Sequence, residues 1–329
     1  MGEEDSIPLN PAPSQPALRS QWVRALRPPI TRPDAKAQAN TLIEQEWTIE
    51  GNPIQTAVVF LINRECPWNC VMCDLWQHTT PNTLPPGHAV LQLKNALKKI
   101  AASSPQPVER IKLYNSGSFF DRRAIHPQDY QAIADALQGF DSVVVESHPR
   151  LIDQRVGEFA RRLKPSLEVA MGLECADDTV LRQLNKRFQL RDYEEAANRL
   201  KHDGIAHRAF IMIQPPFVDP AQAQQSCMKT ITYALDQGAA QLSLIPARPG
   251  AGALEALQAQ GAFSPPTMHT IERCFEEGLN QAQGRLHIDT WDLHTFNPCP
   301  TCNQSRVDRL TQMNRLQTML PAIHCPSCS

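Results

Sequence analysis

Three cysteines lie close together in the stretch NRECPWNCVMCDLW (63–76). Three residues separate Cys66 from Cys70, and two separate Cys70 from Cys73. A structural zinc site usually combines two well-separated cysteine pairs, whereas this stretch has no fourth thiol nearby. Thiolates favour iron–sulfur chemistry, and a loop that holds three corners of a cubane leaves one iron open for a substrate or cofactor. The residues between the cysteines form loops rather than cores, which argues against three buried thiols without a ligand.

A second set of cysteines lies near the end of the chain. CPTC (Cys299 to Cys302) and CPSC (Cys325 to Cys328) are two C-x2-C knuckles with 22 residues between them. This spacing is typical of a four-cysteine zinc ribbon, so zinc is the favoured metal, although an auxiliary iron–sulfur cluster would use the same four thiolates. The remaining cysteines are isolated and are expected to be small buried hydrophobes: Cys175, Cys227 and Cys274.

Alternating strands and helices are expected to position the first cysteine group. Short apolar runs predict strands over 56–63, 110–116, 142–147, 167–174, 207–214 and 240–246. Helical spacing follows over 90–101, 128–137, 155–163, 179–184, 193–200 and 224–235. Six such repeats indicate a parallel α/β barrel or an open doubly wound sheet. Functional groups of these folds gather where strands end, and the first cysteine group directly follows the first predicted strand.

Composition and local sequence divide the 329 residues, 42% of them hydrophobic, into three predicted regions. Residues 1–50 form a proline-rich arm, 51–250 the α/β core, and 251–329 an extension with the C-terminal knuckles. The acidic, proline-broken start has no apolar signal region, and no run approaches the roughly 18 apolar residues of a membrane span. We therefore expect a cytoplasmic protein without a membrane partner, whose cysteines serve as ligands in a reducing compartment.

Charge is unevenly distributed along a chain whose net charge is −2, which excludes a strongly basic nucleic-acid binder but not a local basic face. A basic group near the start predicts a solvated arm: Arg19, Arg24, Arg27, Arg32 and Lys36. Arg306, Arg309 and Arg315 can share one broad helix face, at intervals of three and six residues. That face is either simply solvated or presented to RNA phosphate.

The C-x3-C-x2-C motif after the first strand resembles the signature of the radical S-adenosylmethionine (SAM) enzymes. The resemblance implies a partial (β/α)6 TIM-like barrel of the radical SAM type and a 4Fe–4S cluster on Cys66, Cys70 and Cys73. In that family the open iron chelates SAM. One electron, from a donor such as flavodoxin or ferredoxin, then splits the carbon–sulfur bond to give a 5′-deoxyadenosyl radical.

Motifs at two further strand ends resemble SAM-contacting positions of the same family. YNSGSFFD (114–121) is similar to the glycine-rich motif for the SAM amino group, which implies contacts from Asn115, Ser116 and Gly117. Glu146, in VVVESHP, stands where the family's carboxylate holds the ribose hydroxyls. Taken alone, the first motif is also typical of a turn and the second of a helix-initiating acid.

A longer motif, MGLECADDTVLRQLNKRF (171–188), adds two charged positions. Glu174 stands where relatives have a glutamine or a similar polar group. Lys186 stands where relatives usually place an arginine that pairs with the SAM carboxylate. Lysine keeps that charge without the bidentate fork, and a surface lysine on a helix is the alternative. FIMIQPPFV (210–218) resembles the family's fifth strand but lacks the acidic residue that some relatives have there.

Taken together, these motifs resemble the branch that contains oxygen-independent coproporphyrinogen oxidase, the Elongator catalytic subunit and the methylthiotransferases. Over Thr56 to Leu279 they look most like the radical SAM subunit of archaeosine synthase, which implies modification of a transfer RNA base. Two alternatives remain open: a radical SAM enzyme for a small metabolite or peptide, and a non-catalytic, metal-dependent RNA-binding module. The motifs assign no catalytic residue, and WDLH (291–294) receives no role because a lone histidine is commonly packed or solvated.

Overall fold

The computed structural model describes residues 12–34, 38–48, 51–250, 252–282 and 286–328. Among these residues, eight strands form one curled sheet in chain order, with β1 antiparallel to β2 and the others parallel. The strands are β1 (Asn40–Trp47), β2 (Pro53–Phe60), β3 (Arg110–Tyr114), β4 (Ser142–Ser147), β5 (Ser166–Glu174), β6 (Ala206–Ile213), β7 (Gln241–Pro246) and β8 (Leu286–Ile288). The predicted partial barrel is confirmed.

One helix precedes the sheet, and the others follow the parallel strands, as the six predicted repeats require. They are α1 (Pro16–Ala25), α2 (His88–Ser103), α3 (Tyr130–Ala136), α4 (Gln154–Ala160), α5 (Asp178–Gln183), α6 (Leu190–His202), α7 (Ala223–Asp236), α8 (Ala253–Ala259), α9 (Met268–Ala282) and α10 (Asn303–Leu316). In α6, Tyr193, Ala196, Ala197 and Leu200 are buried at helical spacing, which gives the helix one apolar face toward the core. No described helix is long and apolar enough to cross a membrane.

Two strands lie outside the predicted core. Strand β1 belongs to the predicted arm and β8 to the predicted extension, yet both join the sheet. Helix α10 caps the edge of β8. The Asn314 side chain on α10 accepts a hydrogen bond from the backbone N–H of Ile288 (2.8 Å) and donates one to its carbonyl (2.7 Å). The boundaries of the three predicted regions stay a prediction, because the sheet itself runs through all of them.

The barrel interior is ionic toward the amino ends of the parallel strands. Glu46 of β1 lies 2.5 Å from Lys112 of β3 and 3.4 Å from Arg208 of β6, and Arg208 also pairs with Glu168 at 2.7 Å. Because β1 and β6 are not neighbours in the sheet, this contact crosses the concave interior. The network closes one end of the barrel, and the opposite end is left for a site.

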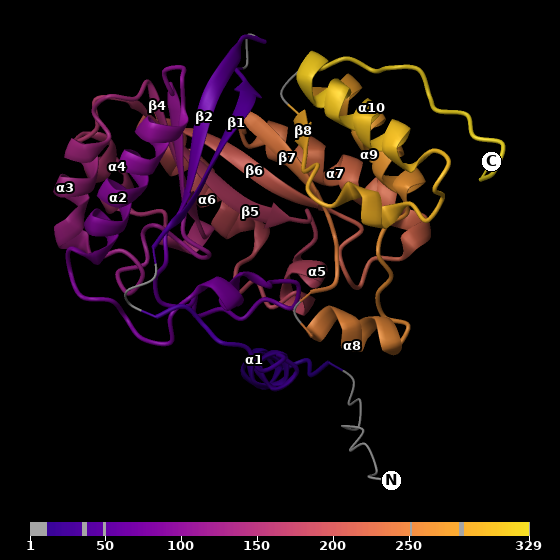
Figure 1. Ribbon diagram of the computed structural model, residues 1–329. Helices are drawn as coiled ribbons and strands as arrows, with labels where there is room; N and C mark the ends of the chain where they lie inside the picture. The colour runs from indigo at the N-terminus through magenta and orange to yellow at the C-terminus, as the bar shows by residue number, and fades with distance from the viewer. Residues whose placement is uncertain (1–11, 35–37, 49–50, 251, 283–285, 329) are drawn as a thin grey trace.

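At the other end, α1 and α8 lie together, as Figure 1 shows. Val23 of α1, Val71 of the cysteine loop, and Leu254 and Leu257 of α8 share a small apolar core. Gly252 makes this approach possible, because an added Cβ would lie 2.0 Å from the Leu26 carbonyl oxygen. The arm, the cysteine loop and the start of the extension therefore form one layer over the carboxyl ends of the strands.

Candidate active site and metal centre

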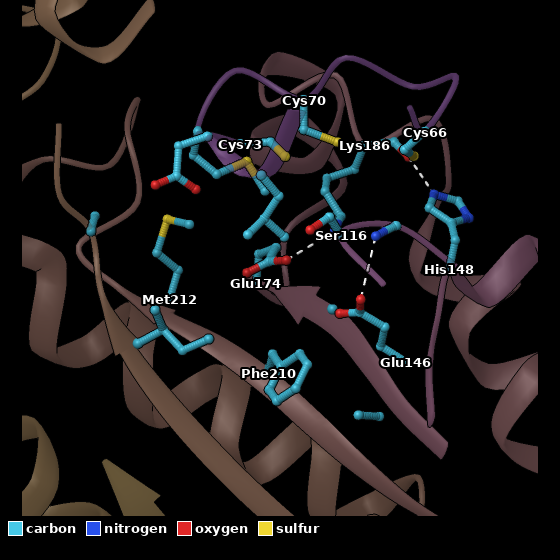
Figure 2. Close-up of a pocket in the computed structure, with 18 of the residues that line it drawn as sticks. Cys66, Cys70, Cys73, Ser116, Glu146, His148, Glu174, Lys186, Phe210 and Met212 are labelled. Atoms are coloured by element: carbon cyan, nitrogen blue, oxygen red, sulfur yellow. Dashed lines mark hydrogen bonds and ion pairs between the residues drawn. The ribbon is translucent and has the colours of Figure 1, made fainter. Parts of the chain in front are cut away.

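A cavity of about 410 Å³ lies at the carboxyl ends of the parallel strands. Figure 2 shows the predicted residues around it, with the three cysteines on one side and Phe210 and Met212 on the other. The following predicted site residues line it: Cys66, Cys70, Cys73, Ser116, Gly117, Glu146, Glu174 and Lys186. Asn115 is not among the lining residues and is fully buried in the same loop as Ser116 and Gly117.

The cysteine loop (residues 63–76) is held by the chain segment that precedes Lys186. The Asn185 amide donates to the carbonyls of Trp68 (2.8 Å) and Asn69 (2.9 Å), and the Val71 N–H donates to the Leu184 carbonyl (3.0 Å). Asn69 itself has a φ of 50°, a left-handed conformation that asparagine tolerates better than most residues. The loop conformation is therefore fixed by protein contacts on both sides of Cys70.

The N-terminal arm fixes the same loop from outside. Arg27 and Arg32 pair with Glu65 at 2.6 and 2.8 Å, and both guanidinium groups lie over the Trp76 ring. Arg19 is buried and donates to the last carbonyls of α5. The expectation of a solvated arm was therefore wrong for these three arginines, because carboxylates, carbonyls and an aromatic face lie within reach. Arg24 is exposed, and Lys36 lies outside the described residues.

Burial dominates the electrostatics of the three thiols. It raises the pKa of Cys66 and Cys70 above the usual thiol value and that of Cys73 to about 12, and neighbouring thiols add to the rise at Cys66 and Cys73. At neutral pH these groups are thiols. Binding a metal would displace their protons, because the ligating form is the thiolate.

Glu146 is engaged with the backbone of the 115–117 loop. Its Oε1 accepts the N–H groups of Asn115 (2.5 Å) and Gly117 (3.3 Å), while burial raises the pKa of Glu146 to about 7 despite these hydrogen bonds. Ser116 has a φ of 52°, and a Cβ at position 117 would lie 3.4 Å from Cys66 Cβ. Glu146 thus holds the loop close to the cysteines, and its predicted contact with ribose stays a prediction.

Asn115 has an unusual environment for a buried amide. Both its Oδ1 and its Nδ2 are buried without a hydrogen-bond partner. Such groups normally find partners, since leaving one unpaired costs roughly 1–3 kcal/mol.

Glu174 and Lys186 form a buried ion pair at the cavity, with Nζ 2.9 Å from Oε1. A bulge in β5 turns Glu174 inward at a φ of 64°. The ion pair lies against Gly172, because a Cβ there would lie 2.6 Å from Oε1 of Glu174 and 2.9 Å from Nζ of Lys186 and would displace the ends of both side chains. Burial alone would lower the pKa of Lys186, but attraction to Glu174 and Cys70 outweighs it and raises the pKa.

His148 and Trp68 were missed by the sequence analysis. Their rings stack at 3.9 Å, and His148 Nε2 lies 2.7 Å from the Lys186 carbonyl oxygen. The Arg150 N–H donates to Nδ1, which assigns the proton to Nε2, and burial lowers the pKa of His148 to about 3. A neutral His148 thus links the cysteine loop to Lys186. Its sequence signal was its place directly after the strand predicted over 142–147.

The wall away from the cysteines was also missed. Phe210, Met212 and Ile245 make it apolar, and an ion pair between Arg248 and Asp289 (2.7 Å) makes its polar end. Arg248 follows β7, and Asp289 follows the three-residue strand β8, which is too short to predict from its sequence. The cavity therefore has room and chemistry beyond the predicted cofactor residues.

The four C-terminal cysteines come together, with all four sulfur atoms within 4.8 Å of one another. The Cys299–Cys325 and Cys302–Cys328 sulfur pairs are 3.8 and 3.4 Å apart. Hydrogen bonds from Asn297 (3.4 Å) and Arg306 (3.3 Å) reach the Cys302 sulfur and lower the pKa of Cys302 to about 6. The arrangement is that of a metal centre. The other three cysteines are buried, as predicted: Cys175, Cys227 and Cys274.

The expectation that Arg306 and Arg309 share a solvent-facing surface with Arg315 was wrong. Arg306 pairs with Glu272 of α9, and the buried Arg309 lies 2.7 Å from Glu276 of the same helix. Both guanidinium groups are therefore used inside the protein. Arg315 is exposed.

Comparisons with known proteins show what the chain is similar to. No protein-family model matches the chain. The chain is 26% identical over 240 residues to archaeosine synthase subunit beta of Methanosarcina acetivorans, covering 68% of each protein. It is also 26% identical to the same subunit of Thermococcus kodakarensis, over 50% of this chain and 52% of the relative.

The fold is similar to that of archaeal Elp3 from Methanocaldococcus infernus, with a TM-score of 0.51 and 14% identity over 68% of this chain and 58% of that one. The alignments thus span between about half and two thirds of the relatives' lengths. They confirm the resemblance found in the cysteine and strand-end motifs: the chain is similar in sequence to archaeosine synthase β subunits and shares the fold of Elp3.

Proposed function

We propose that this protein is a radical SAM enzyme that cleaves SAM reductively at a 4Fe–4S cluster in order to modify a transfer RNA base. One observation carries the proposal: Cys66, Cys70 and Cys73 line the same cavity as Glu146, Glu174 and Lys186. The fold brings these residues together from the segment after β2, from the ends of β4 and β5, and from the segment after α5.

The residues that line the cavity fit both a 4Fe–4S cluster and SAM. Three soft thiolates suit iron–sulfur ligation and leave one corner of a cubane for SAM. When bound, the cluster would supply the electron that splits the carbon–sulfur bond of SAM, with dithionite or a flavodoxin or ferredoxin as its source. The thiol-rich site suits a reducing compartment, and we place the protein in the cytoplasm.

The chain's own residues would bind and orient SAM. Lys186, held in place by Glu174 and by the His148 contact to its backbone, would attract the SAM carboxylate. Glu146 uses Oε1 for the loop, so Oε2 would accept from the ribose hydroxyls. The backbone of Ser116 and Gly117, which line the cavity, would serve the polar groups of SAM, as the resemblance also implies for Asn115.

Transfer RNA is proposed as the substrate because the curated relatives are named archaeosine synthase subunits. The chain aligns with only part of their length, so the reaction on the base is left at the level of base modification. The cavity wall formed by Phe210, Met212 and Ile245 would suit a planar base beside SAM.

For the C-terminal centre we propose a single zinc ion. Zinc–sulfur bonds of about 2.3 Å in a tetrahedron set the sulfur atoms roughly 3.8 Å apart. The observed sulfur distances of 3.8 and 3.4 Å support this arrangement. A cubane interposes irons and sulfides between its ligands and would need the sulfur atoms farther apart.

The test is anaerobic reconstitution followed by SAM and dithionite. We expect absorbance near ~400 nm from thiolate-bound iron–sulfur and formation of 5′-deoxyadenosine. A variant with Cys66, Cys70 and Cys73 all changed to alanine should lose both, whereas Cys175→Ala, a buried thiol outside the cavity, should keep both. If the triple variant still forms deoxyadenosine, the assignment is wrong. If neither protein cleaves SAM but both bind transfer RNA, the non-catalytic binding module becomes the better description.

A further inference from the structure

A short segment at the cavity mouth presents an exposed aromatic ring. We call residues 289–297, which follow β8, the rim loop. Its first residue, Asp289, lines the cavity together with Arg248. Two residues later, Trp291 is 67% exposed, more than any other large hydrophobic side chain among the described residues. Tryptophan combines a large apolar ring with a polar N–H and is therefore enriched at binding interfaces.

The backbone of Trp291 is fixed although its ring is exposed. Arg248 Nη1 donates to the Trp291 carbonyl (2.7 Å), and Asp289 Oδ1 accepts from the Trp291 N–H (3.0 Å). The remaining guanidinium atoms of Arg248 pair with Asp289 and lie over the Phe296 ring at 5.6 Å. The ring is therefore presented by the same ion pair that forms the polar end of the cavity.

The other end of the rim loop is held by the metal centre. Asn297 donates to the Cys302 sulfur, and Asn303, the residue after Cys302, donates to the His294 carbonyl (2.8 Å). Leu293 and Phe296 are buried in the main core. The rim loop is thus held at one end by the cavity residues Arg248 and Asp289 and at the other by contacts with the four-cysteine centre.

The surroundings of the ring favour a planar polar-edged ligand over an apolar peptide. The exposed neighbours on the rim loop are Asp292, His294 and Thr295, all polar. A peptide bound through apolar side chains would need a continuous apolar patch. An isolated aromatic face surrounded by polar groups instead matches the stacking platforms that bind bases of nucleic acids.

We propose that Trp291 stacks on a base of the RNA substrate at the cavity mouth, and that the four-cysteine centre holds the rim loop for this contact. This inference rests on the proposed RNA substrate. Arg248 and Asp289 act as positioning residues, because their polar atoms are largely used in holding the loop.

The experiment measures the affinity of an unmodified transfer RNA transcript at fixed salt for the full chain with its metal centre loaded. Trp291→Ala should weaken binding by about 5- to 150-fold, the range for loss of one stacked base. Trp291→Phe should restore most of the affinity while losing the part of the tryptophan emission that RNA quenches. Leu91→Ala, which truncates an exposed side chain on α2 at 57% exposure, is the matched control and should bind like the wild type.

The outcomes separate the two proposals. Wild-type affinity of Trp291→Ala would overturn the stacking role and leave the enzyme assignment standing. If the wild type cleaves SAM but does not bind the transcript, both the RNA substrate and the stacking role are wrong. If the wild type binds RNA and loses affinity on Trp291→Ala without cleaving SAM, the stacking role holds and the radical chemistry is wrong.

Discussion

The protein has two cysteine sites that use the same side chain in opposite ways. At the C-terminal centre, four sulfur atoms lie within 4.8 Å of one another, and Asn297 and Arg306 donate to one of them. At the cavity, burial raises the pKa of the three thiols, and they line a space of about 410 Å³ shared with other groups. The sulfur positions of the first site suit one ion, and the second site leaves room for something larger.

The difference shows that the spacing of the cysteines and the groups around them determine what the thiols can bind. Each C-terminal knuckle presents two sulfur atoms from a tight turn, so two knuckles complete a tetrahedron without other ligands. The cavity loop has no matching knuckle elsewhere, and its charged neighbours, Glu174 and Lys186, pair with each other. The open side of that site is where a cofactor would complete the ligands.

The largest expected effect is removal of the C-terminal metal. Structural zinc contributes roughly 10–16 kcal/mol of apparent binding free energy in zinc-finger peptides, which is folding free energy. Changing Cys302 and Cys325 to alanine should therefore abolish hydrogen-exchange protection at 297–302 and 320–328. Protection within α10 should fall less, because Leu310 and Met313 are buried in the main core.

The cavity provides the contrast for that measurement. Changing Cys66, Cys70 and Cys73 to alanine should leave hydrogen-exchange protection of the barrel unchanged in the protein without a cluster, because protein contacts fix the loop. Equal loss of protection in both variants would remove the distinction between a structural and a functional cysteine site.

The next effect concerns the ion pair in the cavity. Lys186→Met leaves Glu174 buried without its partner and should lower the free energy of unfolding by about 3–5 kcal/mol in the cluster-free protein. The double variant Lys186→Met with Glu174→Gln should recover most of the lost free energy of unfolding. Its affinity for SAM should stay weak. Urea unfolding measures the first effect and SAM titration of the reconstituted protein the second. If Lys186→Met is as stable as the wild type, then Glu174 does not depend on Lys186 to offset the cost of burying its charge.

A smaller effect, on metal affinity, is expected from Arg306, which donates a hydrogen bond to the Cys302 sulfur. Arg306→Ala removes the hydrogen bond to the Cys302 sulfur and the pair with Glu272, and should reduce metal affinity by about 10- to 100-fold. Arg315→Ala, on the exposed side of the same helix, is the control and should bind metal like the wild type. Competition with a chelator gives both affinities, and equal values would mean that the Arg306 contact does not stabilise the thiolate.

Much of the barrel could be predicted because each parallel strand carries its own apolar run. Ala57, Val58 and Val59 of β2 are buried on both faces, which gives a continuous signal. Strand β1 was missed because its sequence, NTLIEQEW, contains Glu44 and Glu46. Glu46 is half-buried because it pairs with Lys112 and Arg208 across the barrel, and Glu44 pairs with Lys112. That contact depends on the closed fold, which a local pattern does not contain.

The candidate site was predictable where spacing alone carries the chemistry, as in the two cysteine groups. It was not predictable where the role depends on a distant partner. The stack of Trp68 on His148 joins two loops 80 positions apart in the sequence. Arg306 and Arg309 have the spacing of a solvated helix face, but Glu272 and Glu276 of α9 lie opposite them. Helical spacing shows which residues share a face and not what that face meets.

The most direct test of the two-site account is metal analysis with zinc-edge X-ray absorption on the anaerobically reconstituted protein. The account predicts one zinc per chain with four sulfur neighbours at about 2.3 Å and no nearby iron, together with about four irons per chain. The iron should disappear when Cys66, Cys70 and Cys73 are changed to alanine, and the zinc should remain. About eight irons per chain without zinc, or loss of zinc from the cavity variant, would contradict it.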